Sequence, residues 1–520
     1  MATSSGFGDV AVTPHELATL AAMEIYVLGG NAVDASVAAN AVQGVVAPET
    51  CGIGGDLFAL VHRPDDATPA TLNASGRAGS GVDPAALRRS GLTSIPFDHP
   101  ASVTVPGCVD GWIALLARFG SMPLAEVLSP AIRYAQDGFA MSAELAGALT
   151  RRSAQLEPAA PELFTTNPPT PGIRLVRRDL AHTLREIADG GREAFYEGSA
   201  GKAISDAVHG QITAEDLAAK QAEWVDPVSI EVFGRIGWTT PPNSQGYLTL
   251  ASAWIFSQLD APTDRIDGEY VHLQVEAYRS VAWERDDLVA DPYRIPLAPD
   301  RLVAPDRLRE RVRAIDRNRA GAWPQPGPAQ GGTAYLGFVD RDDMAVSLIQ
   351  SNYTGIGSGI VASGAGFFLH NRGAGFNLIP GHSNELTPGR RPLHTLSPTL
   401  WTRNGRLDTV LGTRGGHYQP QLLLQMATAL FHTQMNPRQA QESPRWVLDD
   451  ASPGTSSRLH VEGRTPDALI DELERRGHTV GRVADYERGW GPVSIIQVAE
   501  DGLRSAAADP RAATARAAVR

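Results

Sequence analysis

Thr333 follows two glycines, Gly331 and Gly332, at the end of a stretch rich in Pro, Gly and Gln. A threonine hydroxyl is a poor nucleophile until a base takes its proton, and one known base is the α-amino group of the same residue. An internal threonine gains a free α-amino group only when the preceding peptide bond is cut, and a Gly-Gly dipeptide leaves room for such an attack. This pattern permits self-cleavage between Gly332 and Thr333 followed by catalysis at Thr333. Taken alone, it is far more typical of an ordinary threonine that starts a strand.

Gly415 and Gly416 form a second candidate group. Acyl transfer needs donors aimed at the oxygen that becomes negative, and the backbone N–H groups of two consecutive glycines can supply them because no side chain crowds the site. The pair stands between an expected strand, 407–412, and an expected helix after Pro420, so a tight turn also explains it. The two interpretations are compatible.

Metal and cofactor motifs are weak. The 13 histidines include no HExxH or other ligand spacing, so we predict no metal. The glycines between 355 and 366 follow an expected strand, but their spacing does not match a dinucleotide fingerprint, and we predict no cofactor.

The sequence also predicts the main helices and strands that must position these residues. The Ala-rich segment 14–46 has apolar residues at helical spacing, with Gly29-Gly30 separating two expected helices. The linker-like segment 322–332 cannot form a regular helix or a central strand. Two alternating apolar runs, 334–339 and 344–350, predict a β-hairpin, which places Thr333 at the start of a strand. The Ala/Arg-rich tail after residue 506 is expected to be a surface extension.

Composition narrows the classes of partner. The chain has 520 residues, 42% of them hydrophobic, and a net charge of -12, which argues against a nucleic-acid or anionic-membrane surface and favours a small-molecule substrate. Its longest apolar run, 32–47, is too short and too polar to span a membrane. The N-terminus has no signal-peptide pattern, and the two cysteines form no disulfide framework, so we expect a cytoplasmic protein.

A series of segments resembles the γ-glutamyltransferase family in the order of that family. They are GGNAVDASVAAN (29–40), SVTVPGCVDGW (102–112), MPLAEVLSPAIRYAQDGF (122–139), TAYLGFVDRDDMAVSLIQSNYTGIGSGI (333–360), PLHTLSP (392–398), GTRGG (412–416) and AADPR (507–511). The resemblance implies the four-layer αββα sandwich of the N-terminal-nucleophile hydrolases. It also implies a large fragment, 1–332, and a small fragment, 333–520, intertwined as a heterodimer, with further dimerisation left open.

The resemblance also assigns roles to individual residues. Thr333 matches the processed N-terminal nucleophile, and Ser351 matches the hydroxyl residue that hydrogen-bonds it. Arg77 occupies the position of the arginine that binds the substrate carboxylate, a task suited to a bidentate guanidinium. His394 and Thr395 replace two adjacent serines near that carboxylate.

The pocket departs from the family pattern in its charge. γ-Glutamyl enzymes have an acidic pair before a phenylalanine, and its second carboxylate binds the substrate ammonium, whereas this chain has Gly375 there. Tyr353 replaces the usual asparagine, and Arg372 adds a cation that attracts an anion. We therefore expect a small carboxylate-bearing or oxalyl-type acyl substrate, with the acyl group passed from Thr333 to water or an amine. A genuine glutathione hydrolase or γ-glutamyltransferase, a C–C bond hydrolase of specialised (antibiotic) metabolism and an unprocessed non-catalytic scaffold remain alternatives.

Overall fold

The computed structural model describes residues 3–322, 332–449 and 457–520, and two seven-stranded antiparallel sheets form its centre. The first sheet carries Thr333 and is called the nucleophile sheet after the role predicted for that residue. In spatial order it consists of β21 (Arg516–Val519), β2 (Val10–Thr13), β10 (Gly332–Val339), β11 (Ala345–Tyr353), β3 (Asp56–His62), β4 (Ala70–Ala74) and β7 (Glu223–Val225). The second sheet consists of β1 (Ser4–Gly6), β20 (Arg504–Ala507), β19 (Val493–Val498), β15 (Arg406–Thr413), β14 (Thr399–Arg403), β9 (Arg235–Thr239) and β8 (Val228–Val232).

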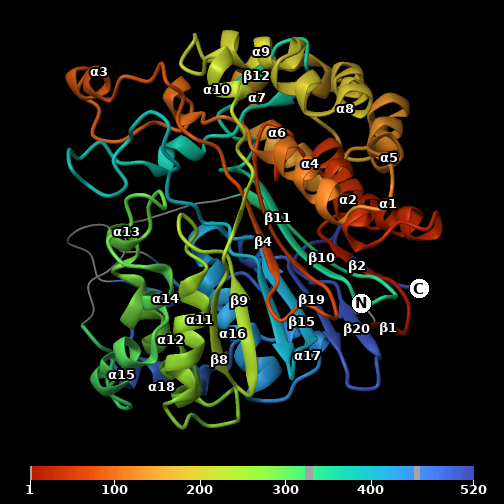
Figure 1. Ribbon diagram of the computed structural model, residues 1–520. Helices are drawn as coiled ribbons and strands as arrows, with labels where there is room; N and C mark the ends of the chain where they lie inside the picture. The colour runs from red at the N-terminus through yellow and green to blue at the C-terminus, as the bar shows by residue number, and fades with distance from the viewer. Residues whose placement is uncertain (1–2, 323–331, 450–456) are drawn as a thin grey trace.

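Helices cover the outer face of each sheet (Figure 1). The nucleophile sheet is covered by α1 (Glu16–Val27), α2 (Ala32–Val46), α4 (Cys108–Phe119), α5 (Leu124–Asp137) and α8 (Arg178–Tyr196). The second sheet is covered by α11 (Tyr247–Ser257), α12 (Gly268–Ala282) and α16 (Gln419–Phe431). The fold is therefore the expected four-layer αββα sandwich.

Shorter elements complete the described chain. The helices are α3 (Pro84–Arg89), α6 (Ala143–Arg151), α7 (Ser153–Leu156), α9 (Ser199–Ala207), α10 (Ala214–Ala218), α13 (Arg285–Leu288), α14 (Pro299–Leu302), α15 (Pro305–Ala314), α17 (Pro437–Glu442) and α18 (Asp467–Arg475). The strands are β5 (Phe139–Ala140), β6 (Arg174–Leu175), β12 (Val361–Ala362), β13 (Phe367–Phe368), β16 (Trp446–Leu448), β17 (Leu459–Glu462) and β18 (Val480–Val483).

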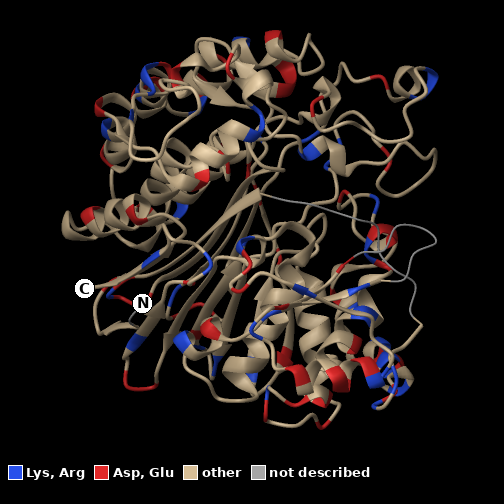
Figure 2. Ribbon diagram, turned by 180° about the vertical axis from the view of Figure 1, so that it is seen from behind, with Lys and Arg blue, Asp and Glu red and all other residues tan. Residues whose placement is uncertain are grey.

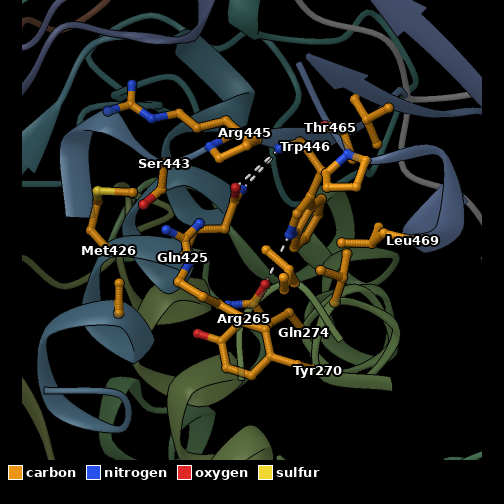
Figure 3. Close-up of a pocket in the computed structure, with 16 residues that line it drawn as sticks. Arg265, Tyr270, Gln274, Gln425, Met426, Ser443, Arg445, Trp446, Thr465 and Leu469 are labelled. Carbon is orange, nitrogen blue, oxygen red and sulfur yellow. Dashed lines mark hydrogen bonds between the residues drawn. The ribbon is translucent and has the colours of Figure 1, made fainter. Parts of the chain in front are cut away.

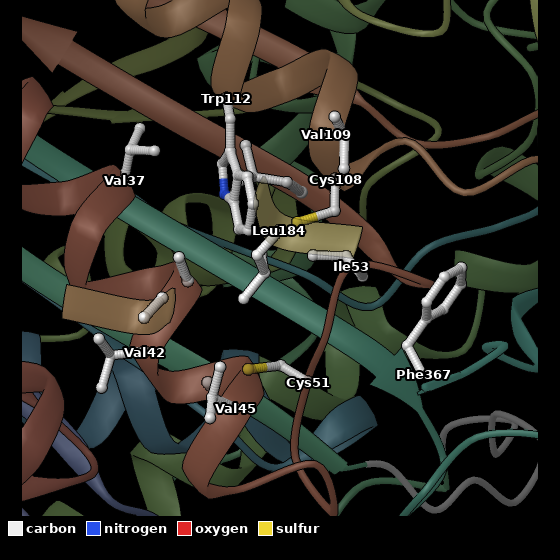
Figure 4. Packing of buried hydrophobic residues seen from close by; sticks show 14 of the residues in the cluster. Val37, Val42, Val45, Cys51, Ile53, Cys108, Val109, Trp112, Leu184 and Phe367 are labelled. Atoms are coloured by element: carbon white, nitrogen blue, oxygen red, sulfur yellow. The ribbon is translucent and has the colours of Figure 1, made fainter. Parts of the chain in front are cut away.

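Strand β10 shows why both sheets are buried. Its side chains alternate, so that Leu336 and Phe338 pack in the core beneath the helices while Tyr335 and Val339 pack in the core between the sheets. The core beneath the helices contains apolar side chains of α2, including Val42 and Val45, together with Cys51 and Cys108 (Figure 4). Both cysteines are buried free thiols. Strand β10 is therefore buried on both faces, between the helical layer and the second sheet.

Most local predictions are confirmed, and one is wrong. The two early helices and the β10–β11 hairpin form as expected, whereas the linker prediction at 322–332 lies largely outside the described residues. The tail after residue 506 is not a surface extension, because β21 pairs with β2 and Arg511 is buried against Glu462. A charged residue buried in an ion pair has the same appearance in a sequence as an exposed one, so its burial could not be predicted.

Charged side chains of both signs are interspersed over the outer helices and loops (Figure 2). None of the described helices is long and apolar enough to cross a membrane.

Candidate active site

Thr333 lies at an irregularity in the β10–β11 hairpin. Gly332 pairs with Tyr353 and Ala334 pairs with Gln350, so two residues of β11, Ser351 and Asn352, stand opposite the single residue Thr333. Such a bulge interrupts the ladder and redirects a side chain. The Thr333 side chain is buried, and its Oγ1 donates a hydrogen bond to Ser351 Oγ at 3.2 Å.

The Ser351 hydroxyl contacts both groups of the proposed cleavage reaction. It donates to the carbonyl oxygen of Gly332 while accepting from Thr333 Oγ1 and, at 2.7 Å, from the backbone N–H of Tyr353. The hydroxyl is therefore held by three partners between the attacking oxygen and the carbonyl that would be attacked.

Tyr353, whose backbone N–H donates to Ser351, contacts Arg372 through its ring. The guanidinium carbon of Arg372 lies 3.4 Å from the centroid of the Tyr353 ring, a cation–π contact. Arg372 is buried, its Nη1 donates to Thr395 Oγ1 at 3.4 Å, and its Nε and Nη2 have no hydrogen-bond partner within the described chain. Burial lowers the pKa of Arg372 from its ordinary value. Arg372 is thus a buried cation with unused hydrogen-bond donors on Nε and Nη2.

His394 is held by a buried carboxylate. Its Nε2 donates to Asp56 Oδ2 at 3.1 Å, and Asp56 Oδ1 accepts from the backbone N–H of Gly76 at 2.9 Å. Burial lowers the pKa of His394 to about 4 although Asp56 opposes the shift. Burial would raise the pKa of Asp56, but the nearby His370 and His394 lower it below its usual value. His394 is accordingly a neutral ring at pH 7 whose Nε2 is already engaged.

The Arg77 side chain turns toward an acidic partner. It pairs with Glu223, which also pairs with Arg391 at 3.0 Å, and its Nη1 donates to the side chain of Gln221 at 3.3 Å. Its backbone adjoins the Asp56 site, since the preceding residue, Gly76, donates to that carboxylate. A substrate carboxylate would therefore compete with Glu223 for Arg77.

The glycine pair follows a strand that is stacked against β10. Gly337 of β10 faces Val410 of β15, and Tyr335 faces Gly412. The segment after Thr413, the last residue of β15, holds the pair, Gly415 with φ +132° and Gly416 with φ +57°.

The glycine pair is held in place from one side. Gln245 Nε2 donates to the carbonyl of Gly416 at 3.0 Å and to that of Thr395 at 3.2 Å. The backbone N–H groups of Gly415 and Gly416 have no acceptor among the described residues. This arrangement leaves two N–H groups available for an oxyanion.

Two residues of this region were missed from the sequence. Arg285 of α13 is buried, and its guanidinium hydrogen-bonds His417, the residue after Gly416. Burial lowers the pKa of His417 well below its ordinary value, and the charges of Arg285 and Arg372 lower it further. Two guanidinium groups therefore act on one neutral ring beside the glycine pair. Arg285 lies in an ordinary polar segment 132 residues from His417, so no sequence signal could have linked them.

One cluster in the described chain has the composition of a metal site. His272, Glu276 and His478 bring their ligand atoms within 4.8 Å of one another, but His272 Nδ1 and His478 Nε2 already hydrogen-bond at 2.8 Å, and Glu276 pairs with Arg279. The cluster belongs to the helical layer outside the second sheet. We assign no metal to it.

Comparisons with known proteins show similarity in sequence and in fold over nearly the whole chain. Residues 18–519 match the sequence profile described as Gamma-glutamyltranspeptidase. The chain is 36% identical to the Glutathione hydrolase-like YwrD proenzyme of Bacillus subtilis, over 97% of each chain. It is 35% identical to the Oxamate amidohydrolase proenzyme of Klebsiella pneumoniae, over 96% of this chain and 97% of that one. The crystal structure of cephalosporin acylase from Bacillus halodurans superposes with a TM-score of 0.91 at 32% identity, covering 100% of this chain and 97% of the other.

Proposed function

Because the chain belongs to the γ-glutamyltranspeptidase family of N-terminal-nucleophile hydrolases, we propose that it cleaves itself between Gly332 and Thr333 and then uses Thr333 in catalysis. The acyl group of a small carboxylate-bearing or oxalyl-type compound forms an ester with Thr333. Water or an amine then receives this acyl group.

Ser351 supports the cleavage step. Its hydroxyl donates to the Gly332 carbonyl and accepts from Thr333 Oγ1, which polarises the one group and orients the other. Attack of Oγ1 on the carbonyl carbon, with transfer of the hydroxyl proton to the leaving nitrogen, replaces the peptide bond by an ester. Hydrolysis of that ester by water leaves a carboxylate on Gly332 and a free amine on Thr333.

The strand order supports association of the resulting fragments. Strands β10 and β11 of the small fragment, 333–520, lie between β2 and β3 of the large fragment, 1–332. Separation of the fragments would expose buried apolar side chains on both faces of the sheet. The fragments therefore remain together as a heterodimer, and both curated relatives named above are described as proenzymes.

In the acyl-transfer step the free amine of Thr333 takes the proton from Oγ1. The oxygen attacks the substrate carbonyl, and the backbone N–H groups of Gly415 and Gly416 stabilise the negative charge that develops on the carbonyl oxygen. Collapse of the intermediate expels the leaving group with the proton held by the amine. An incoming water or amine reverses these proton transfers and frees Thr333.

The observation that carries the substrate class is the buried guanidinium of Arg372. Two of its nitrogen atoms, Nε and Nη2, have no hydrogen-bond partner within the described chain. Burying a cation without a counterion is costly, and a substrate carboxylate would offset that cost. Arg285, which is paired with Asp286 at 2.8 Å, is a second buried guanidinium beside the glycine pair. The ammonium of a γ-glutamyl group would instead face a like charge and, at Gly375, no carboxylate. The relative described as oxamate amidohydrolase supports the same choice.

Kinetics on the processed protein test the proposal. We expect a higher kcat/KM for oxamate than for γ-glutamyl p-nitroanilide, and we expect Arg372→Gln to raise the KM for oxamate about tenfold or more through loss of a charge-assisted pair. Arg403→Gln, which removes an exposed arginine at the end of β14, is the matched control. A clear preference for the γ-glutamyl compound would refute the proposed substrate class and favour a glutathione hydrolase.

A further inference from the structure

A cavity lies in the helical layer outside the second sheet, away from the nucleophile sheet. It is a hollow partly open to solvent between α12, α16, α18 and the β16–β17 pair, and about 40 Å³ of it is accessible to the centres of water-sized molecules (Figure 3). Most of its wall is apolar. The main apolar groups are Ile266, Val271, Met426, Ala429, Trp446 and Leu469.

The walls of the cavity are fixed by hydrogen bonds among their own residues. The indole Nε1 of Trp446 donates to Gln274 Oε1 at 2.9 Å, and the backbone of Trp446 exchanges two hydrogen bonds with the side chain of Gln425 (Figure 3). The two glutamines come from α12 and α16. The aromatic wall is thus preformed, which lowers the entropic cost of binding.

Arg265 supplies a cation at this cavity without a carboxylate partner. Its hydrogen bond within the described chain is a weak one from Nη1 to the sulfur of Met435 at 3.6 Å, and no ion pair of the described residues includes it. The pKa of Arg265 is lowered from its ordinary value, mainly by burial and further by the charge of Arg464. Tyr270 and Asp264 oppose this shift. The neighbouring Asp264 acts on this guanidinium without contacting it.

Thr465 adds a second polar position. Its hydroxyl is buried, lines the same cavity and has no hydrogen-bond partner in the described chain. A buried hydroxyl without a partner costs free energy that a ligand oxygen can recover. The cavity therefore combines an apolar body with a cation and an unused hydroxyl.

We infer that this cavity is a second ligand site, which binds a small monocarboxylate with an aromatic or aliphatic body. The carboxylate pairs with Arg265, and the body lies against Trp446 and Leu469. This site is independent of the proposed acyl site, because its walls contain none of the residues around Thr333. Part of its wall belongs to α16, which follows the glycine pair.

Calorimetric titration of the full-length protein with 3-phenylpropanoate tests the inference, with 3-phenylpropanamide as the neutral probe of the same shape. We expect the acid to bind at least tenfold more tightly than the amide, and Arg265→Gln to weaken acid binding about tenfold or more. Thr465→Val, which keeps the side-chain shape, should weaken it less. Arg372→Gln should leave it unchanged, since that variant alters only the proposed acyl site.

Three results would overturn the inference: no measurable binding of the acid, equal binding of acid and amide, or binding that survives Arg265→Gln. Binding that disappears in Arg372→Gln would place the acid at the acyl site instead and would also overturn it. Failure here leaves the proposed function intact, because the oxamate kinetics do not depend on this cavity.

Discussion

The guanidinium of Arg372 fills the space in front of the α-carbon of Gly375, where a side chain would otherwise stand. The glycine therefore has two effects: it lacks the carboxylate of the family pattern, and it leaves room for the Arg372 guanidinium. A Cβ at this position would collide with the guanidinium and would lie 2.9 Å from the carbonyl oxygen of Leu393. Compared with the family pattern, a positive charge thus replaces a negative one at this position, and the cation occupies the space of the missing side chain.

Gly375→Asp alone should consequently lower the melting temperature and fail to create γ-glutamyl activity. Arg372→Asn/Gly375→Asp removes the nearer of the two obstructions, the guanidinium, and leaves the Leu393 carbonyl oxygen; we expect its kcat/KM for γ-glutamyl p-nitroanilide to exceed that of the parent. Differential scanning calorimetry and anilide kinetics measure the two effects. If Gly375→Asp is as stable as the parent, the steric relationship is wrong.

Thr333→Ala should remain a single chain, because it lacks the attacking hydroxyl. Thr333→Ser keeps the hydroxyl and should cleave between residues 332 and 333, more slowly. Intact-mass spectrometry of the purified proteins distinguishes these outcomes. Cleavage at another bond, or cleavage in the alanine variant, would exclude Thr333 as the processing residue.

Ser351→Ala should slow both self-cleavage and turnover about tenfold or more, because the nucleophile loses an orienting hydrogen bond. Ser347→Ala is the matched control, since Ser347 is buried on the same strand and hydrogen-bonds Tyr335 at 2.8 Å. Time courses of cleavage and kcat measure the effect. Equal losses in the two variants would indicate a structural role only for Ser351.

Gly416→Ala should reduce kcat by about a hundredfold, since a displaced oxyanion donor costs about 2.7–4 kcal/mol of transition-state stabilisation. Gly405→Ala in the β14–β15 turn controls for backbone strain, because Gly405 has φ +76° with open space around it while Gly416 has φ +57°. Both variants should lose stability, but only Gly416→Ala should lose activity. Normal turnover of Gly416→Ala would remove the pair from the mechanism.

The buried His394 predicts a specific pH dependence of stability. Between pH 6.5 and about 4 its ring binds a proton in the unfolded chain but not in the folded one, so stability is lost as the pH falls through this window. The contribution is at most about 3 kcal/mol. His394→Gln should flatten the curve of unfolding free energy against pH, and His182→Gln, at an exposed position, should not. Parallel curves for His394→Gln and the parent would contradict the assignment.

The sequence predicted the nucleophile and the elements around it for local reasons. Alternation in 334–339 and 344–350 indicates two strands, and the hairpin turn between them needs only neighbouring residues, so the placement of Thr333 at a strand start followed directly. The ordered family segments added the sandwich fold and identified Ser351, whose hydroxyl the structure places 3.2 Å from that of Thr333.

The long-range parts of the site were beyond the sequence. The engagement of Arg77 by Glu223 joins residues 146 positions apart, and the engagement of His394 by Asp56 joins residues 338 apart. No periodicity or spacing encodes such contacts. Both residues were expected to be available to substrate, and in the described structure both already have partners.

Three properties could be predicted from the sequence by itself, because they depend on residue type and near neighbours. They are the candidate cleavage site at the Gly-Gly-Thr segment, the alternation of apolar residues in the hairpin strands and the loss of an acidic residue at Gly375. Only the tertiary structure decided where the charges act. Stacking of the two sheets brings Tyr335 of β10 against Gly412 of β15, and packing of α13 brings Arg285 to His417. The physical reason is that the environment of a buried cation depends on which layers close around it, and that closure is a property of the whole fold.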